Sequence, residues 1–477
     1  MSDAPTDFRR TKIVCTIGPA TRTVETMCEL IGAGADVFRL NFSHGTESEH
    51  AENVAMTREA AKRCGKEIGI LGDLPGPKLR LGDLEGGVVQ LDVGQEVTIT
   101  TRDVVGDEKT LPVSWNGLPK AVRQDGEVYL ADGRIRLRVE EKDEVSVRCR
   151  VEVGGPVASH QGLNLPGAEV TLPSAGRDDL AWVDFALTHG IDLLAVSFVR
   201  RAEDLEPVER RIRTSGSDIP VLAKIEKPQA AERAEAIIKA TTAGIMVARG
   251  DLGIELPLAQ VPSVQRRLIS LAGKHSRPCI TATQMLASMV SSPRPTRAEV
   301  SDVANAIYQG TDAVMLSEET AVGEHAVEAV KVMNQIALAT EPELPYADWV
   351  FNRASSEGDV AGSVARAAVG STYTLGLAAL VVPTRSGRTA RVVSAHRPKV
   401  PILAVSPRIE TVRRLNLLFG VQCAVADEWT GITQLLDDCS RLARENGVAK
   451  SGDLIGITAG LPSQELGTNL FEVHRVP

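Results

Sequence analysis

Eight short apolar runs, each ending in polar or charged residues, recur between residues 11 and 319 and limit the folds open to this chain. Apolar residues at helical spacing separate the runs, as in residues 24–31, where Gly32 and Gly34 are expected to end the helix. The runs are residues 11–19, 36–43, 68–77, 192–198, 220–226, 244–251, 278–284 and 312–319. Eight strand and helix units with polar residues at the carboxyl ends of the strands predict a (β/α)8 TIM barrel of the α/β class, with its active site on that face.

The alternation is interrupted once, by residues 81–167, which contain short β-like alternations punctuated by glycine. This pattern predicts an inserted β-barrel-like lid domain. A second strand and helix series after about residue 345 predicts a C-terminal open-sheet α/β domain. The expected division is therefore a barrel from residues 1–80 and 168–345, a lid from 81–167 and a C-terminal effector domain from 346–477.

Composition limits the partners and the cellular location that we expect for this protein. The 477 residues carry a formal net charge of −9 and no basic cluster interleaved with aromatic residues, so nucleic acid is not an expected partner. The seven cysteines contain no C-x-x-C pair, which favours reduced thiols. No signal-peptide pattern and no apolar run of membrane-spanning length is present, so we expect a cytoplasmic protein without a membrane partner.

The polar strand ends predict a site for phosphoryl chemistry. Residues two apart in a strand share a face, so we expect several pairs to point together into the barrel mouth. Glu226 and Asp251, on adjacent strands, are the carboxylates expected to hold Mg²⁺, with Mn²⁺ able to substitute. Nearby lysine and arginine suit a phosphoryl group, although any single pair could equally be a structural ion pair. The pairs expected to point inward are Arg39 with Asn41 and Ser43, Lys224 with Glu226, Arg249 with Asp251, and Thr281 with Thr283.

Eight stretches in order carry a resemblance to the pyruvate kinase family over nearly the whole chain: TKIVCTIGPA, RLNFSHG, GDLPGPKLR, GLNLPG, AKIE, GIMVARGDLGIELP, ATQMLASM and DAVMLSEETAVG. The resemblance implies a barrel, a lid and a C-terminal α/β domain. It also implies transfer of the phosphoryl group of phosphoenolpyruvate to ADP, which gives pyruvate and ATP in glycolysis.

The resemblance also implies roles for individual residues. Lys224, Thr283 and Arg39 match the catalytic positions: Lys224 would stabilise the phosphoryl group in flight, Arg39 would hold the phosphate, and Thr283 would lie beside the enolate carbon. Gly250 would let its own amide and that of Asp251 reach the substrate carboxylate, with a helical turn beginning at residue 252 beneath the anion. Arg249 would brace the site through an ion pair with a neighbouring carboxylate. Asn41, His44 and Arg80 match the nucleotide side.

Two departures from the family pattern stand out. Gln161 replaces a lysine that often contacts nucleotide phosphate from the lid. Much of the family reads DTKGPEIR where this chain reads DLPGPKLR, and there K⁺ is held by groups equivalent to Asn41, Ser43, Asp73 and the carbonyl of residue 74. Leu74 and Lys78 match the branch in which a lysine replaces the glutamate and supplies the positive charge of K⁺. We therefore expect K⁺ not to be required, although the retained ligands could still bind it and Lys78 could form a salt bridge at the lid hinge.

The stretch PTRSGRTAR, residues 383–391, follows an apolar run and opens a predicted helix. Backbone N–H groups and hydroxyls there can surround a phosphate, although an ordinary glycine turn with a capping serine would look similar. The family is commonly a homotetramer regulated at this loop, so we expect a sugar phosphate or nucleotide effector. The effector residues would be Thr384, Arg385, Ser386, Gly387, Arg388 and Thr389.

Two other classes of function remain open from the residues. A phosphoenolpyruvate-binding mutase or lyase would share the metal carboxylates but would need neither Arg80 nor a lid. A non-catalytic sensor would need only the C-terminal site, and the presence of Lys224, Glu226, Asp251 and Thr283 argues against it.

Overall fold

The computed structural model describes residues 8–477 except 132, 169–171, 353–358 and 461–467. Eight parallel strands close into a barrel in the order β1-β16-β15-β14-β13-β12-β3-β2, which confirms the predicted fold class. Each strand falls within one of the eight apolar runs. Their bounds are β1 Lys12–Thr16, β2 Val37–Asn41, β3 Gly69–Asp73, β12 Leu193–Val196, β13 Val221–Ile225, β14 Gly244–Ala248, β15 Cys279–Ala282 and β16 Ala313–Leu316.

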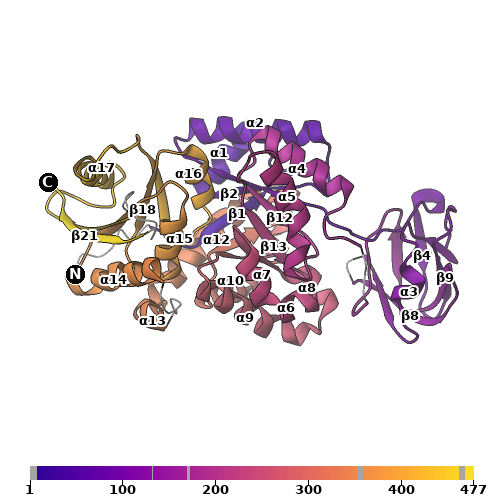
Figure 1. Ribbon diagram of the computed structural model, residues 1–477. Helices are drawn as coiled ribbons and strands as arrows, with labels where there is room; N and C mark the ends of the chain where they lie inside the picture. Colours follow the sequence, from indigo (N-terminus) through magenta and orange to yellow (C-terminus); the bar gives the residue numbers. More distant parts are fainter. Residues whose placement is uncertain (1–7, 132, 169–171, 353–358, 461–467) are drawn as a thin grey trace.

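Helices surround the barrel and cover the outer faces of its strands (Figure 1). Strand side chains facing inward, including Val14, Leu71 and Met246, form one apolar cluster, and those facing outward join a larger cluster with the helices. The helix at residues 24–33 ends at Gly34, whose left-handed backbone caps it, whereas Gly32 lies inside the helix. The barrel helices are α1 Val24–Ala33, α2 Glu47–Arg63, α4 Arg177–His189, α5 Glu206–Thr214, α6 Pro228–Glu232, α7 Ala234–Ala240, α8 Arg249–Glu255, α9 Val261–Lys274, α10 Arg297–Tyr308, α11 Glu318–Ala321 and α12 Ala326–Thr340.

The insertion between β3 and β12 is a small β domain that stands away from the barrel (Figure 1). Its main sheet has the order β11-β7-β8-β9-β5-β6, and alternate side chains such as Val97, Ile99 and Leu137 fill a core of its own. Two antiparallel connections join it to the barrel, with Leu81 N donating to Gln161 O and Leu163 N to Leu79 O. The elements are β4 Val88–Leu91, β5 Glu96–Thr100, β6 Thr110–Pro112, α3 Leu118–Ala121, β7 Glu127–Leu130, β8 Ile135–Lys142, β9 Ser146–Val153, β10 Gly155–Ala158 and β11 Leu163–Asn164.

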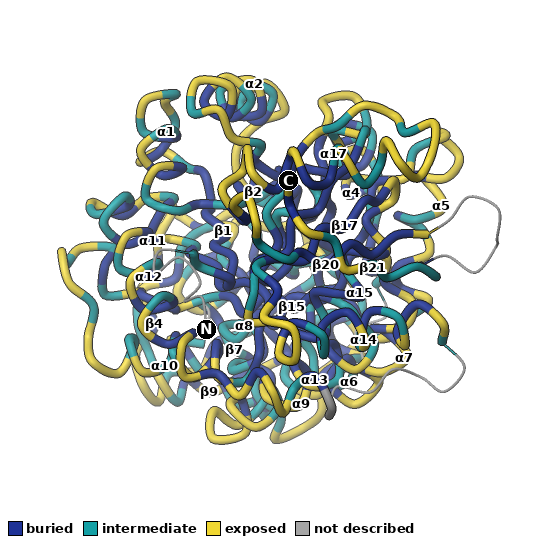
Figure 2. The backbone as a smooth tube through the Cα atoms, turned by 90° about the vertical axis from the view of Figure 1, so that its left-hand side faces the viewer, coloured by how far each residue is buried: buried dark blue, intermediate teal, exposed yellow. Residues whose placement is uncertain are grey.

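The C-terminal domain is an open sheet of order β19-β18-β17-β20-β21, parallel except for the last strand. Apolar clusters on both faces of this sheet separate it from the barrel core. In Figure 2 the barrel strands and the central strands β17 and β20 of this sheet are largely buried, while β21 is not and the outer helices alternate between buried and exposed residues. The elements are α13 Tyr346–Asn352, α14 Val360–Leu375, β17 Ala379–Pro383, α15 Arg388–Ala395, β18 Ile402–Ser406, α16 Ile409–Leu415, β19 Val421–Val425, α17 Ile432–Glu445, β20 Leu454–Ala459 and β21 Leu470–Arg475.

The seven cysteines form no disulfide. Within the described ranges, no helix combines the length and the apolar character needed to cross a membrane.

Candidate active site

A polar cavity of about 350 Å³ lies between the barrel mouth and the lid. The barrel supplies residues from the carboxyl ends of its strands, and the lid and its connections supply Arg80, Gln161 and their neighbours. The lining residues are Arg39, Asn41, Ser43, His44, Pro75, Lys78, Arg80, Ser159, His160, Gln161, Gly162, Ser197, Phe198, Lys224, Glu226 and Asp251. The structure thus brings most of the expected barrel-mouth residues together with Gln161 and Lys78, two of the three residues that depart from the family pattern.

Lys224 lies at the centre of a buried charge network. Its Nζ is 2.9 Å from Glu226 Oε1 and 3.1 Å from Asp73 Oδ1, and it donates to Ser197 Oγ at 2.8 Å. Burial disfavours the ammonium, but the two carboxylates outweigh that cost and raise the pKa of Lys224 above its usual value. Lys224 is therefore a permanent cation at neutral pH.

Arg39 extends the network on the phosphate side. Its Nε donates to Asp73 Oδ2 at 2.7 Å, and its Nη1 donates to Thr16 Oγ1 at 3.0 Å. Burial alone would raise the pKa of Asp73, yet Lys224 and Arg39 together hold that pKa below its usual value. Asp73 is thus an anion that fixes two cations at the barrel mouth.

The expected metal carboxylates lie in the same cavity. Glu226 directly follows β13, and Asp251 lies in the first turn of α8, which follows the adjacent strand β14. Glu226 is almost completely buried, and its Oε2 accepts a hydrogen bond from Phe198 N at 2.7 Å. Because their donors are carboxylate oxygens, Glu226 and Asp251 suit a hard cation such as Mg²⁺ or Mn²⁺. The described residues contain no cluster of three or more His, Cys, Asp or Glu side chains, and Mg²⁺ does not need one, since it takes its remaining ligands from water and substrate oxygens.

Two of the four pairs expected to point together into the barrel mouth do not do so. β14 ends at Ala248, and residues 249–255 form α8, so the turn expected to begin at residue 252 begins earlier and Arg249 turns away from Asp251. Arg249 Nη1 pairs with Asp302 Oδ2 at 2.5 Å, and its Nη2 donates to Thr283 O. The helix forms this early because the chain leaves the sheet immediately after its last buried apolar residue.

The second exception is at β15. Thr281 is fully buried and hydrogen-bonds to Thr311 inside the protein, so it does not reach the mouth. Thr283 lies beyond the strand in a left-handed conformation with φ of 69°. Its Oγ1 accepts from Gly250 N at 2.7 Å, so the Gly250 amide expected to bind substrate is held by Thr283 in this state. A ligand carboxylate at Gly250 would have to displace that hydroxyl.

The expected K⁺ ligands fall into two groups. Asn41 and Ser43 line the cavity, and Ser43 N donates to Asn41 Oδ1. Asp73 is committed to Arg39 and Lys224, and the Leu74 carbonyl accepts from Ser197 Oγ at 2.7 Å. Lys78 lines the same cavity as Asn41 and Ser43. Burial, reinforced by Arg80, Lys78 and Arg39, lowers the pKa of His44, which favours a neutral imidazole there.

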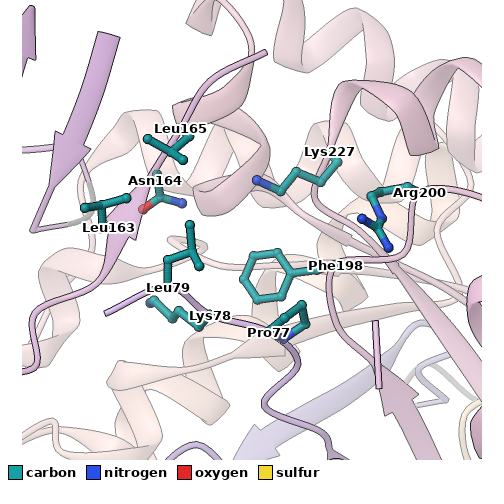
Figure 3. A pocket seen from close by; sticks show the side chains of 9 residues that line it. All are labelled: Pro77, Lys78, Leu79, Leu163, Asn164, Leu165, Phe198, Arg200 and Lys227. Atoms are coloured by element: carbon teal, nitrogen blue, oxygen red, sulfur yellow. The ribbon is translucent and has the colours of Figure 1, made fainter. Parts of the chain in front are cut away.

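A small second cavity of about 30 Å³ lies at the lid hinge (Figure 3). The Phe198 ring lies among Pro77, Leu79 and Lys227 in this view, and Lys227 Nζ pairs with Glu255 at 2.5 Å. Phe198 has φ of 54°, an uncommon conformation for a bulky residue, and this conformation accompanies the bond from its N–H to Glu226. The hinge packing and the expected metal ligand are therefore linked through one strained residue.

Ser197 and the double role of Asp73 were missed by reasoning from sequence. Ser197 connects Lys224 to the Leu74 carbonyl and is 1% exposed. The available signal was a polar residue at the carboxyl end of the fourth strand run, directly before Phe198.

The expected effector loop lines a separate cavity of about 470 Å³ in the C-terminal domain. Thr384, Arg385, Ser386, Arg388 and Thr389 all face it. Gly387 caps the start of α15 with φ of 79°, and a Cβ there would lie 2.9 Å from Leu415.

Hydrogen bonds shape this loop. Gly387 N donates to Thr384 Oγ1 at 3.0 Å, and Arg385 pairs with Glu428. Residues 461–467 directly follow Gly460, which lines this cavity, and lie outside the described residues.

Comparisons with known proteins agree with this architecture. The family model "Pyruvate kinase, barrel domain" matches residues 8–330, and "Pyruvate kinase, alpha/beta domain" matches residues 362–474. The chain is 42% identical to "Pyruvate kinase" of Geobacillus stearothermophilus over 98% of this chain and 80% of that protein. It is 40% identical to "Pyruvate kinase" of Thermococcus litoralis over 98% and 99% of the two chains. A solved pyruvate kinase from Cryptosporidium parvum superposes with a TM-score of 0.94 at 35% identity, covering 100% of this chain and 98% of the other.

Proposed function

The chain belongs to the pyruvate kinase family of phosphotransferases, and from this premise we propose that it transfers the phosphoryl group of phosphoenolpyruvate to ADP with Mg²⁺ and without a requirement for K⁺. The observation that carries the proposal is the gathering of Arg39, Lys224, Glu226 and Asp251 in one cavity beneath the lid. A mutase or lyase would need neither the lid nor Arg80, the residue expected to face the nucleotide, which lines that cavity. A sensor would not need the buried charge network.

In the proposed reaction the bond between phosphorus and the enol oxygen breaks, and a new bond forms to a terminal oxygen of ADP. Arg39 binds the phosphoryl oxygens in the ground state. Lys224 stabilises the charge that develops on them during transfer, an electrostatic contribution of the kind that is typically largest in such sites. Asn41, His44 and Arg80 lie on the nucleotide side. On this nucleotide side Gln161 provides a neutral amide in place of the positive charge of the lysine that the family often has.

The enolate that remains takes a proton at carbon to give pyruvate. We assign Thr283 to the place beside the enolate carbon, either as the proton donor or as the residue that positions a proton-donating water molecule. Its hydroxyl is held between Gly250 N and the Ala282 carbonyl, to which it donates at 2.6 Å, so it has a defined orientation before substrate binds. Gly250 and Asp251 amides would receive the substrate carboxylate.

Glu226 and Asp251 would hold the divalent metal, which when bound neutralises and orients phosphate oxygens. Independence from K⁺ is supported by Lys78, which lines the cavity beside Asn41 and Ser43. A unit charge about 4 Å from a phosphate is worth roughly 4 kcal/mol at an effective dielectric constant near 20, enough to replace the contribution of an ion. A fixed ammonium also disfavours a second cation nearby.

The C-terminal domain is the proposed site of regulation. We place a phosphorylated effector, a sugar phosphate or a nucleotide, against residues 384–389 and expect a homotetramer in the cytoplasm. The cavity at this loop supports the first of these, because its hydroxyls and arginines face one space of ligand size.

The direct test of the reaction is a coupled assay for ATP and pyruvate. Phosphoenolpyruvate and ADP should give both products in equal amounts. Consumption of phosphoenolpyruvate without ATP would point to the mutase or lyase class instead.

A further inference from the structure

Three arginines lie close together where the barrel packs against the C-terminal domain, and within the described part of the chain no carboxylate is paired with any of them. Arg388 and Arg391 lie three residues apart on α15, on one helix face, and Arg277 lies between α9 and β15 of the barrel. Among the described residues, none of the three has an acidic group within 4 Å, whereas most other arginines around the barrel are paired. We call Arg277, Arg388 and Arg391 the interdomain arginine cluster.

Hydrogen bonds tie two members of the cluster to one helix end. Arg391 Nη1 donates to Thr242 O at 3.1 Å, and Arg277 Nε donates to Ile238 O at 3.4 Å, both at the carboxyl end of α7. A helix end offers about half a negative charge. Among the residues that the structure describes, most of the positive charge of the three guanidinium groups is therefore not compensated.

The neighbouring acidic group is already committed. Asp312 faces the same crevice as Arg277 and Arg391, but its Oδ1 pairs with Arg397 Nη1 at 2.6 Å and its Oδ2 accepts from Cys279 N. Arg397 is 1% exposed and donates further to Gly310 O, so this pair is a closed structural unit. Asp312 thus balances Arg397 and leaves the cluster cationic.

The cluster bears the signs of mutual repulsion. Burial, together with the charges of Arg277 and Arg388, lowers the pKa of Arg391 to about 10, and burial and Arg388 also lower the pKa of Arg277. Arg391 Nε is buried and has no hydrogen-bond partner in the part of the chain that the structure describes. An uncompensated buried cation is costly unless a ligand meets it.

We propose that the interdomain arginine cluster binds a phosphate-type oxyanion at the junction of the barrel and the C-terminal domain. Guanidinium groups match phosphate oxygens with pairs of parallel hydrogen bonds, which makes this the anion class of choice. Arg277 and Arg391 line the crevice, which itself holds only about 10 Å³, so the anion sits at its mouth. Arg388, three residues before Arg391 on α15, is exposed. Arg388 also lines the cavity of the effector loop, which places the new site beside the proposed effector site but on the barrel side of α15.

The test is calorimetric titration of the full chain with inorganic phosphate at constant ionic strength. Arg391→Met and Arg277→Met keep the apolar part of the side chain and remove one guanidinium each. We expect each to weaken one phosphate-binding event at least tenfold. Arg441→Gln is the matched control, since Arg441 is exposed on α17 and already pairs with Asp438 and Glu445, and it should bind as the wild type does.

Two further variants identify the site that is lost. Ser386→Glu blocks the effector loop and Arg80→Gln alters the substrate cavity, and neither should remove the event that depends on Arg391. The proposal would be overturned if phosphate binding were lost in Ser386→Glu or Arg80→Gln but kept in Arg391→Met and Arg277→Met. It would also be overturned if the wild type showed no saturable binding of phosphate. Comparing inorganic phosphate with glycerol 3-phosphate then distinguishes free phosphate from a phosphorylated metabolite as the preferred occupant.

Folding of the variants is checked without phosphate. At low ionic strength the two methionine variants should unfold at or above the wild-type temperature, because removing one cation relieves the repulsion among the others. If these arginines only hold the two domains together, the methionine variants should instead unfold at a lower temperature than the wild type and bind phosphate with unchanged affinity.

Discussion

Lys224 Nζ and Glu226 Oε1 lie 2.9 Å apart, so the cation assigned to the transferring phosphoryl group is held by a carboxylate assigned to the metal. The two residues lie two positions apart at the end of β13 and point to the same side. Glu226 is buried and the Lys224 side chain is only 12% exposed, so loss of either partner would leave a costly unpaired charge. A metal bound at Glu226 would loosen this pair and leave Lys224 freer to meet phosphate.

Lys224→Met should remove most of the phosphoryl transfer. We expect kcat to fall by roughly 10² to 10³, or about 2.7 to 4 kcal/mol, which is typical for the loss of one preorganised electrostatic contact. Binding of Mn²⁺ should persist because Glu226 and Asp251 remain. Lys239→Met, which removes an exposed lysine paired with Glu235, is the control. Near-normal turnover in Lys224→Met would end the assignment.

Glu226→Gln should weaken the metal site. Even outer-shell partners of a metal commonly contribute about 10-fold to 100-fold to affinity, so a ligand should contribute at least that much. Paramagnetic titration with Mn²⁺ measures the effect directly. Asp251→Asn should behave in the same way, and Glu235→Gln on the barrel surface should not. Unchanged Mn²⁺ affinity in both site variants would place the metal elsewhere.

Ser386→Glu should abolish effector binding without affecting the barrel mouth. The added carboxylate would face the cavity lined by Thr384, Arg388 and Thr389 and repel a phosphate there. Calorimetry with a small panel of sugar phosphates and nucleotides should find a binder for the wild type that this variant loses. If no member of the panel binds the wild type, the loop is only a glycine-containing helix start.

Stability should depend on pH through His50. Burial lowers the pKa of His50 despite the bond from its Nε2 to the His44 carbonyl, and its Nδ1 is buried without a partner among the described residues. Folding therefore favours the neutral ring. This contribution is complete above the unfolded-state pKa, near 6.5, and is lost as the pH falls from there toward the lower folded-state pKa.

The check is the unfolding temperature of wild type and His50→Gln between pH 8 and pH 5. The difference between the two proteins should favour the wild type most at high pH and shrink as the pH falls. A difference that is constant across this range would show that His50 does not titrate on unfolding.

The fold could be predicted from sequence because each barrel strand is an apolar run bounded by polar residues, and strand pairing in a barrel follows from that order. The site could be predicted only in part. Parity placed Lys224 and Glu226 on one face, since Lys224 lies near the end of β13 and Glu226 directly follows the strand. It failed at Arg249, because α8 begins at the residue directly after β14. It also failed for Thr281 with Thr283, because Thr281 is buried inside the protein and Thr283 lies beyond β15 in a left-handed conformation. Periodicity cannot locate the residue at which a strand stops.

The contacts of Ser197 and Asp73 were beyond sequence reasoning for another reason. Asp73, at the end of β3, contacts Arg39 on the neighbouring strand β2 and Lys224 on β13, beyond β12. Ser197, directly after β12, contacts the Leu74 carbonyl. These contacts depend on the curvature and stagger of the closed barrel. The interdomain arginine cluster likewise joins residues more than a hundred positions apart in the chain. Only the packing of the described residues shows that none of these arginines has an acidic group within 4 Å.

The most direct measurement of the account is the initial rate of ATP formation from phosphoenolpyruvate and ADP at constant ionic strength, with K⁺ replaced by tetramethylammonium and with Mg²⁺ present or removed by chelation. The account predicts almost the same rate without K⁺, no rate without a divalent metal, and acquired dependence on K⁺ in Lys78→Glu. A tenfold or greater fall in the wild-type rate without K⁺, or turnover that survives removal of divalent metal, would contradict it.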